Sequence, residues 1–227
     1  MLEVDQSYWS IFHDNTTTAD LFKNTVNHLL SEDYRFSCGR KDEKFRSAIL
    51  PFSYFLERSR VDQRSICYME LNTNLNHDAV IQNQSGSRYI QIGRAIDENE
   101  HLRIEQMKKD GHVDALSPVQ KIPNSKKERQ TKGKFSISIT PIVNERSVVH
   151  TVRFNEILSI VDKKAAKNYP KNVELLFAFD DWTGFDDSVG LLNDFFSNEI
   201  LPRFNEGRIV HLLGYKSIFV TSASIKP

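Results

Sequence analysis

Two hydrophobic periods alternate along the C-terminal part of the chain, between Val152 and Val220. Residues 154–168 carry apolar side chains at helical spacing with lysines beside the apolar stripe, which predicts an amphipathic helix. Residues 173–179 are apolar except for Glu174 and have strand length, typical of a buried strand. The pattern then predicts a second helix at 188–204 and two closing strands at 208–214 and 216–220. This alternation of helices and strands favours an α/β fold.

The N-terminal part of the chain gives shorter signals. Thr18 is a suitable N-cap for a helix that extends to Ser31. Residues 52–58 and 66–72 have the composition of strands and are separated by a polar turn, so we expect them to form a hairpin. The remaining predictions are irregular structure at 1–18 and 72–87, a helix at 89–110, and strands at 135–142 and 148–152.

The chain shows no internal repeat and no clear linker, so a single α/β domain with a central mixed β-sheet flanked by helices is the simplest prediction. In this prediction residues 1–44 form an N-terminal helical extension packed on the core. Residues 45–227 form the core itself.

The composition narrows the class of protein. The chain has 227 residues, of which 39% are hydrophobic and 26% charged, as in folded globular proteins and unlike disordered ones. The formal net charge is zero, so any surface that binds phosphate must be a local patch. No apolar run approaches the roughly 20 residues that span a bilayer, and residues 1–6 do not resemble a signal peptide. We therefore expect a cytoplasmic protein.

The two cysteines, Cys38 and Cys67, have no metal-binding spacing. Free thiols in a reducing compartment are the simpler interpretation, and a disulfide between the two cysteines is the alternative.

Two acidic residues on the predicted hairpin are candidates for metal binding. Glu57 lies near the end of the first predicted strand and Glu70 near the end of the second, so pairing of the strands would bring their carboxylates together. Glu70 and Asn72 share one face, because strand side chains alternate. Converging carboxylates suit Mg²⁺, which takes one or two carboxylates together with substrate phosphates. The structural alternative is an ion pair of Glu70 with Arg58 or Arg64.

The region 45–220 resembles the restriction-endonuclease-like nucleases of the PD-(D/E)xK type. In that family a carboxylate on one strand is followed by Glu-x-Lys on the adjoining strand, and here Glu57 is followed by Glu70-Leu71-Asn72. The lysine-rich helix that ends in Lys167-Asn168-Tyr169, just before the strand at 173–179, also resembles small bacterial and phage members.

The resemblance implies Mg²⁺-dependent hydrolysis of phosphodiester bonds in DNA, with Glu57 and Glu70 as metal ligands. Asn72 stands where the family has its lysine. Lys164, at the edge of the apolar stripe of its helix, is the candidate substitute, and a lysine there would stabilise negative charge on the phosphate. The alternative for these lysines is a solvated helix face. The missing lysine favours a second interpretation, a non-catalytic module of the same fold that binds protein or nucleic acid.

Other polar segments offer weaker candidates. Aspartates follow the strand at 173–179, where α/β proteins often place their sites, but aspartate is also an ordinary loop and helix-capping residue. His77-Asp78 can be a base with its orienting partner or a plain polar loop pair. Phosphate-binding glycine motifs and the His-Glu-x-x-His motif are absent from the sequence. The aspartates are Asp180, Asp181, Asp186 and Asp187.

A basic loop at 126–134 is the candidate contact with DNA phosphates. Its cations would add affinity that depends on salt and not on sequence. It contains no aromatic residue, so stacking on bases is not indicated. A plain solvated loop is the alternative. The cations are Lys126, Lys127, Arg129, Lys132 and Lys134.

Overall fold

The computed structural model describes residues 6–31, 43–70, 74–95, 119–123, 135–139, 146–179, 189–214 and 220–225. The chain separates into two compact units, one made of residues 1–95 and 154–227 and the other of residues 96–153. In the second unit, β4 (Val119–Pro123) pairs with the antiparallel strand β5 (Phe135–Ile139).

The first unit is built around a six-stranded mixed sheet in the order β1-β2-β3-β6-β7-β8. The central strands β3, β6 and β7 are parallel, and every other neighbouring pair is antiparallel. The predicted α/β class with a mixed sheet flanked by helices is confirmed at this level. The strands are β1 (Ile66–Met69), β2 (Ala79–Asn83), β3 (Gly86–Arg94), β6 (Val173–Phe179), β7 (Ile209–Gly214) and β8 (Val220–Ser224).

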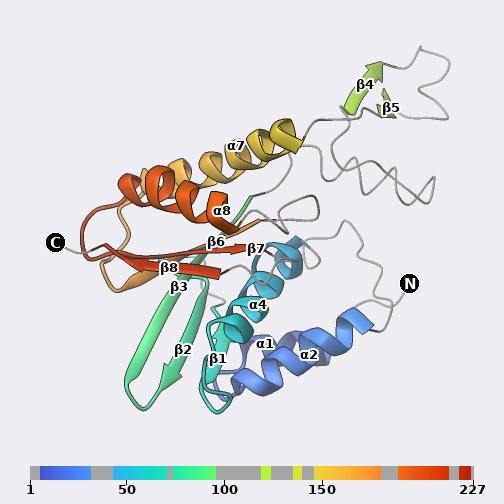
Figure 1. The fold of residues 1–227 in the computed structure, drawn as a ribbon. Helices are drawn as coiled ribbons and strands as arrows, with labels where there is room; N and C mark the ends of the chain where they lie inside the picture. Colours follow the sequence, from blue (N-terminus) through green and yellow to red (C-terminus); the bar gives the residue numbers. More distant parts are fainter. Residues whose placement is uncertain are drawn as a thin grey trace. The chain divides into compact units, whose positions relative to one another are not determined.

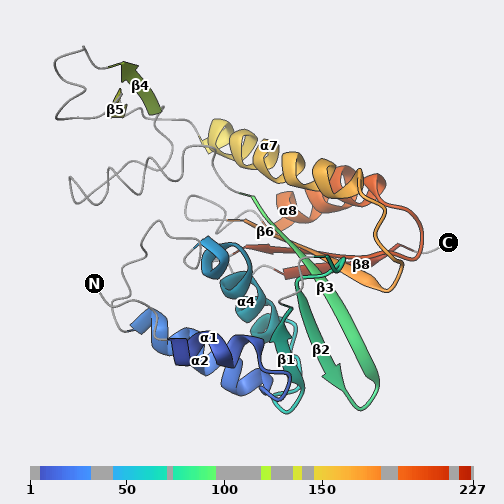
Figure 2. The same ribbon diagram turned by 180° about the vertical axis from the view of Figure 1, so that it is seen from behind.

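Helices cover both faces of this sheet. Figure 1 shows α7 and α8 on one face and α4 on the other, with α1 and α2 beyond it, and Figure 2 shows the same arrangement from behind. We refer to the two faces as the α7 face and the α4 face. The helices are α1 (Gln6–His13), α2 (Ala19–Ser31), α4 (Leu50–Arg58), α7 (Arg146–Ala165) and α8 (Val189–Phe195), with the π-helical segments η1 (Phe45–Ile49) and η2 (Phe196–Ile200) and the 3-10 turn η3 (Leu201–Arg203).

Strand β6 separates two hydrophobic cores because all seven of its residues are buried and their side chains alternate between the faces. Leu176 and Ala178 belong to the core on the α4 face. Leu175 and Phe177 belong to the core on the α7 face, where they pack with Ile157 of α7. The apolar pattern of this strand, interrupted only by Glu174, therefore reflects burial on both sides.

Gly93 of β3 is the point at which α7 comes closest to the sheet. A Cβ atom at this position would lie 2.7 Å from Cγ2 of Ile160 and 3.3 Å from Cδ1 of Phe177. Real Cβ atoms do not approach other atoms this closely, so only glycine allows α7 to rest on β3 here.

Several predicted elements are confirmed. The helix from Thr18 to Ser31 is α2, and Thr18 Oγ1 accepts a hydrogen bond from the backbone N–H of Leu21 at 3.2 Å, as expected of an N-cap. The strands at 173–179 and 208–214 are β6 and β7. The helix at 154–168 corresponds to the larger part of α7.

Four predictions for the chain after residue 44 are wrong, and a fifth concerns the region 1–18. Residues 52–58 form helix α4 and not a strand, because the buried residues Phe45, Ile49, Phe52 and Leu56 recur at helical spacing from η1 into α4. Residues 148–152, predicted as a strand, lie inside α7.

The other two errors concern β2 and β3. The Asn-rich segment at 72–87 contains β2, and the predicted helix at 89–110 begins within β3. The two strands are joined at Gln84 and Ser85, and Gly86 has a φ of 128°, a conformation that glycine adopts without strain. The region 1–18, predicted to be irregular, contains α1.

Two further observations bear on the class of protein. In the part of the chain that the structure describes, no helix combines the length and apolar character needed to cross a bilayer. Cys67 is a free, fully buried thiol, and burial raises its pKa to about 12. Cys38 lies outside the described residues.

The contact at Gly93 generates a stability prediction. Gly93→Ala is expected to lower the free energy of unfolding by about 1–3 kcal/mol, because the added methyl group overpacks the contact with Ile160. Urea denaturation of the purified protein measures this change.

The matched control is Gly190→Ala in α8, where nothing lies within 4 Å of the added Cβ. It is expected to leave stability unchanged or to raise it by up to about 1 kcal/mol, because alanine favours helix. Equal stability of the Gly93→Ala variant and the wild type would contradict the close contact.

Candidate functional site

Three polar side chains cross β1, β2 and β3 in one row on the α7 face. Asp78 immediately precedes β2 and lies opposite Gln91, one step beyond the pair Ala79–Ile90. Glu70 immediately follows β1 and donates its backbone N–H to the carbonyl of Asp78 at 2.8 Å. Opposed residues of antiparallel strands project to the same face. Since Ala79 and Ile90 belong to the core on the α4 face, the row of Glu70, Asp78 and Gln91 faces α7.

Asp78 is held in place by β3. Its Oδ2 accepts a hydrogen bond from the backbone N–H of Ile92 at 2.8 Å and another from the side-chain amide of Gln91. Among the described residues, none donates a hydrogen bond to the second carboxylate oxygen, Oδ1. Within the described part of the chain, the carboxylate is therefore oriented through Oδ2 alone.

Lys164 of α7 lies over this row. Ile160 of α7 contacts the sheet at Gly93 of β3. Gln91 lies two residues before Gly93 in this strand, a distance of about 6.6 Å. Helix α7 runs antiparallel to β3, and four residues forward from Ile160 lead to Lys164, about 6 Å away. The distance from Gly93 to Gln91 along the strand is similar to the distance from Ile160 to Lys164 along the helix. The packing of Ile160 on Gly93 therefore also places Lys164 near Gln91.

The electrostatics of Lys164 agree with this position. Burial lowers the pKa of its ammonium group, the charge of Asp78 opposes this effect, and the charge of Lys167 adds to it. Its Nζ lies 5.9 Å from the centre of the Tyr169 ring, within the range of a cation–π contact. Burial, followed by the charge of Asp78, raises the pKa of Tyr169. Asp78, Lys164 and Tyr169 therefore form one electrostatic group.

Glu70 is accessible from a second direction. It lines a pocket of about 500 Å³ together with His13, Asp14 and Tyr68. His13 donates a hydrogen bond from Nδ1 to the carbonyl of Met69 at 2.9 Å. Burial lowers the pKa of His13, and the neighbouring charge of Glu70 opposes that effect. Glu70 thus lines a space beside the edge strand β1 that is large enough for a small ligand.

The row fits a divalent cation that is shared with a substrate. In the described ranges, no group of three or more His, Cys, Asp or Glu side chains forms a complete metal site. Glu70 and Asp78 are two carboxylates on adjacent strands, and Mg²⁺ is usually held by one or two carboxylates with substrate phosphates. The free Oδ1 of Asp78 is the observation that supports this fit.

The predicted site residues have different outcomes. Glu57 is a correction, because it lies exposed on α4 and the hairpin that would bring it to Glu70 does not form. Strand β1 pairs instead with β2, which places Asp78 beside Glu70. Lys164 lies near the row, as described above. Asn72, the four aspartates at 180–187 and the basic loop at 126–134 lie outside the described residues.

Sequence reasoning did not name Gln91, and it considered Asp78 only with His77, as a base with its orienting partner or as a polar loop pair. In the structure the His77 ring is tilted against the Tyr89 ring, with 4.8 Å between ring centres. The signal that was present is the short apolar run Ala79-Val80-Ile81, which marks β2. Pairing of β2 with β3 makes Asp78 and Gln91 neighbours on adjacent strands.

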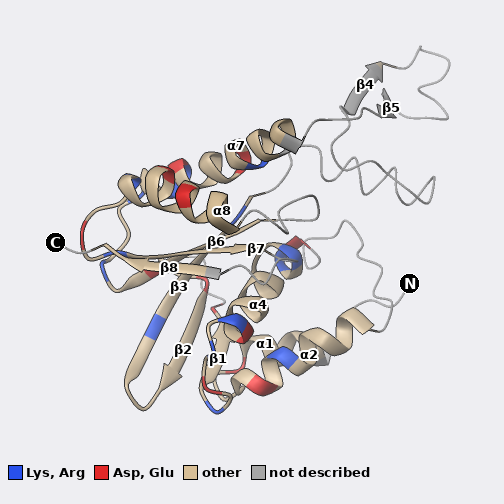
Figure 3. Ribbon diagram, viewed as in Figure 1, with Lys and Arg blue, Asp and Glu red and all other residues tan. Residues whose placement is uncertain are grey.

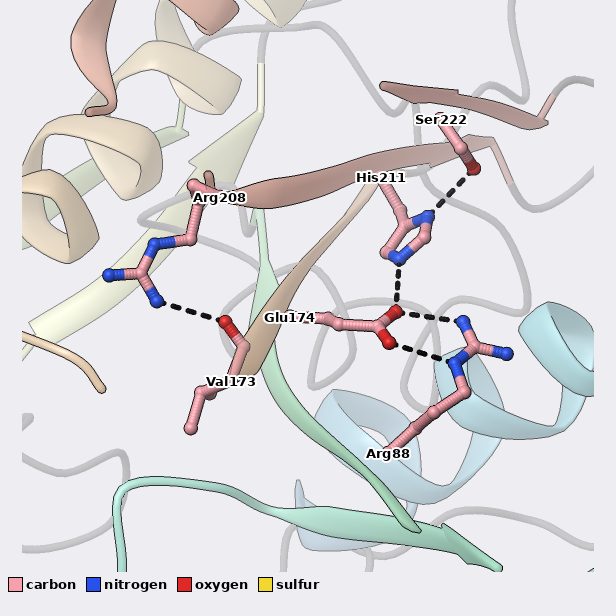
Figure 4. A network of polar contacts seen from close by, with 6 residues as sticks. All are labelled: Arg88, Val173, Glu174, Arg208, His211 and Ser222. Carbon is pink, nitrogen blue, oxygen red and sulfur yellow. Dashed lines mark hydrogen bonds and ion pairs between the residues drawn. The ribbon is translucent and has the colours of Figure 1, made fainter. Parts of the chain in front are cut away.

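A second polar cluster lies on the α4 face, centred on the buried residues Glu174 and His211. Arg88 of β3 donates two hydrogen bonds to the carboxylate of Glu174, at 2.8 and 2.7 Å. His211 of β7 lies 2.7 Å from Glu174 through Nε2 and 2.7 Å from the Ser222 hydroxyl through Nδ1. Figure 4 shows this chain of contacts running from β3 to β8. Figure 3 shows that the strands are otherwise mainly uncharged.

The ionised carboxylate of Glu174 determines the direction of the hydrogen bonds in this cluster. Burial by itself would raise the pKa of Glu174, but hydrogen bonds from Arg88 and His211 outweigh it and lower the pKa to about 2. An ionised carboxylate can only accept hydrogen bonds, so Nε2 of His211 carries a proton. In the neutral ring, Nδ1 then accepts from Ser222. The four residues join four strands, which is a structural role.

Comparisons of this chain with protein-family models, with curated proteins and with solved structures find no match. The functional interpretation therefore rests on the chemistry of the two clusters.

The Glu174 cluster generates a prediction about acid stability. The folded pKa is below the usual value of 4.5, so its contribution is complete above about pH 4.5 and is lost as the pH falls towards 2. A pKa lowered to about 2 corresponds to about 3 kcal/mol. Urea denaturation between pH 7 and pH 3 should show this loss in the wild type and a smaller pH dependence in Glu174→Gln.

Glu174→Gln should also be less stable at pH 7, because Arg88 keeps its charge and loses its partner. The control is Glu206→Gln, at an exposed position, which should retain the dependence of the wild type. An unchanged acid dependence in Glu174→Gln would show that this carboxylate does not control acid stability.

Proposed function

We propose that this protein is a divalent-metal-dependent nuclease that hydrolyses phosphodiester bonds in DNA. The observation that carries the proposal is the row of Glu70, Asp78 and Gln91 with Lys164 above it. A carboxylate pair beside a half-buried lysine provides what phosphodiester hydrolysis needs, a place for a cation and a fixed positive charge at the phosphate.

Each residue has a distinct role in the proposal. Asp78, oriented by the Ile92 N–H, and Glu70 would hold Mg²⁺, which supplies Lewis-acid activation of the phosphate. Gln91 keeps the Asp78 carboxylate in one rotamer through its amide. Lys164 directs its ammonium group to the negative charge that develops on the phosphate oxygens.

The position of Lys164 supports its role. Packing of Ile160 against Gly93 fixes the height of α7 and with it the position of the Lys164 backbone. A charge that is oriented before the substrate arrives costs less reorganisation during the reaction. The β3 segment Gln91-Ile92-Gly93 beside Asp78 contains no lysine. Lys164 of α7 would supply the positive charge that this strand lacks. The proposal keeps the sequence-based role of Lys164 and replaces Glu57 by Asp78.

The activity assay uses linear and circular DNA with Mg²⁺ or Mn²⁺ and an EDTA control. Asp78→Asn keeps the shape of the side chain and removes its charge, so cleavage should fall at least about 100-fold. Lys164→Met should cause a loss of similar size.

The matched control is Lys163→Met, one residue away on the exposed side of α7, and it should cleave at the rate of the wild type. No cleavage by folded, monodisperse wild-type protein would contradict the proposal. The remaining interpretation would then be a non-catalytic binding module of the same fold.

Metal binding is a separate prediction. Mn²⁺ should raise the melting temperature of the wild type, because a ligand that binds only the folded state stabilises it by mass action. At 100 times the dissociation constant this effect is about 2.7 kcal/mol. Asp78→Asn should show little or no shift, whereas Asp62→Asn, in an exposed turn, should respond like the wild type. Equal shifts in the wild type and in Asp78→Asn would place the cation elsewhere.

A further inference from the structure

A pocket of about 250 Å³ lies at the corner where α7 leads into β6 and where β7 begins. Lys164 and Lys167 line it from the end of α7, and Arg203 and Arg208 line it from the segment that leads into β7. Four cationic side chains therefore surround one small space. Lys164 belongs both to this pocket and to the row of carboxylates on the neighbouring strands.

Most of this positive charge is not compensated by the protein. Arg203 forms ion pairs with Asp162 at 2.8 Å and with Glu199 at 3.5 Å. For Lys164, Lys167 and Arg208, no carboxylate of the described residues lies within ion-pair distance. The charge of Lys167 also contributes to the lowered pKa of Lys164. A bound anion would relieve this repulsion.

Arg208 is fixed in a position suited to an anion. Its Nη1 donates to the carbonyls of Pro170 at 2.6 Å and Val173 at 2.9 Å, and its Nη2 donates to the carbonyl of Tyr169 at 2.8 Å. Figure 4 shows the contact with Val173. These acceptors are neutral, so the positive charge remains, and Nε–H has no acceptor among the described residues. The guanidinium group is thus held rigid while one of its donors stays available.

We propose that this corner pocket binds a phosphate group, and that in the proposed nuclease it holds a phosphate of the nucleic acid next to the one that is cleaved. Lysine and arginine from separate elements suit the several oxygens of a phosphate. The end of α7 carries the negative end of the helix dipole, but three uncompensated cations outweigh it. The second part of the proposal rests on the proposed function, since it takes the carboxylate row to be the cleavage site.

The first experiment measures binding of inorganic phosphate to the full chain by calorimetry, in EDTA and at low salt. Lys167→Met removes one exposed cation of the pocket and should weaken binding about tenfold, the effect of one charge-assisted hydrogen bond. The matched control is Lys171→Met, an exposed lysine of the same turn that does not line the pocket, and its affinity should equal that of the wild type. Equal affinity in the wild type and Lys167→Met, or no binding by the wild type, would overturn the proposal.

The second experiment separates the two sources of phosphate and the two proposals. Binding of a short single-stranded DNA is compared with and without a 5′-phosphate, again in EDTA. If the wild type prefers the 5′-phosphorylated DNA and Lys167→Met abolishes this preference, the pocket binds a terminal phosphate. If the wild type binds both DNAs equally and Lys167→Met weakens both, the pocket binds an internal phosphate. DNA affinity that Lys167→Met leaves unchanged would overturn the role in nucleic-acid binding.

The failure of one proposal can be told from the failure of the other. The Asp78→Asn variant should still bind phosphate at least as tightly as the wild type, because Asp78 does not line the pocket and its negative charge acts on Lys164, which does. Phosphate binding without DNA cleavage would leave the pocket in place and reject the nuclease. If Lys167→Met changes neither the cleavage rate nor the substrate affinity, the role of the pocket in binding nucleic acid is rejected and the nuclease proposal is kept.

Discussion

The close packing of α7 on β3 at Gly93 is the constraint on which the candidate site depends. A side chain at this position would collide with Ile160, so the absence of a Cβ sets the distance between helix and sheet. The height of the helix in turn determines where its last turn ends, and with it the position of Lys164 above Gln91 and Asp78. A local property of one residue therefore controls the geometry between a lysine and a carboxylate that are far apart in the sequence.

The two faces of the sheet differ in how far their polar groups are paired within the described part of the chain. On the α4 face, the ionised Glu174 is fully engaged by Arg88 and His211, and this cluster joins strands β3, β6, β7 and β8. On the α7 face, Asp78 has one engaged and one available oxygen, and Lys164 has no carboxylate partner at ion-pair distance in the described ranges. Saturated polar groups stabilise a fold, whereas oriented groups with unused capacity can bind a ligand. This difference is the reason for assigning the functional role to the α7 face.

The fold class was predictable because its strongest signals are local. The apolar run of β6 and the amphipathic pattern of α7 follow from burial of those elements on two faces and on one face, respectively. Helix α4 was not predictable from its nine residues, since Phe52, Tyr54 and Phe55 have strand propensity. Its helical period becomes visible only when Phe45 and Ile49 are included. Tertiary packing determined the secondary structure of this segment, because its local composition suits both a helix and a strand.

The candidate site was only half predictable, for a geometric reason. Lys164 stands out in the sequence because its spacing from the apolar residues of α7 marks it as an edge position. Asp78 has no such mark, since its meaning comes from the register of β2 with β1 and β3, which depends on contacts between separate segments. A shift of the β2 register by one residue would turn Asp78 to the α4 face, into a hydrophobic core. The site is therefore specified by the apolar residues Ala79 and Ile81, which hold that register by burying themselves against α4, as much as by its own polar side chains.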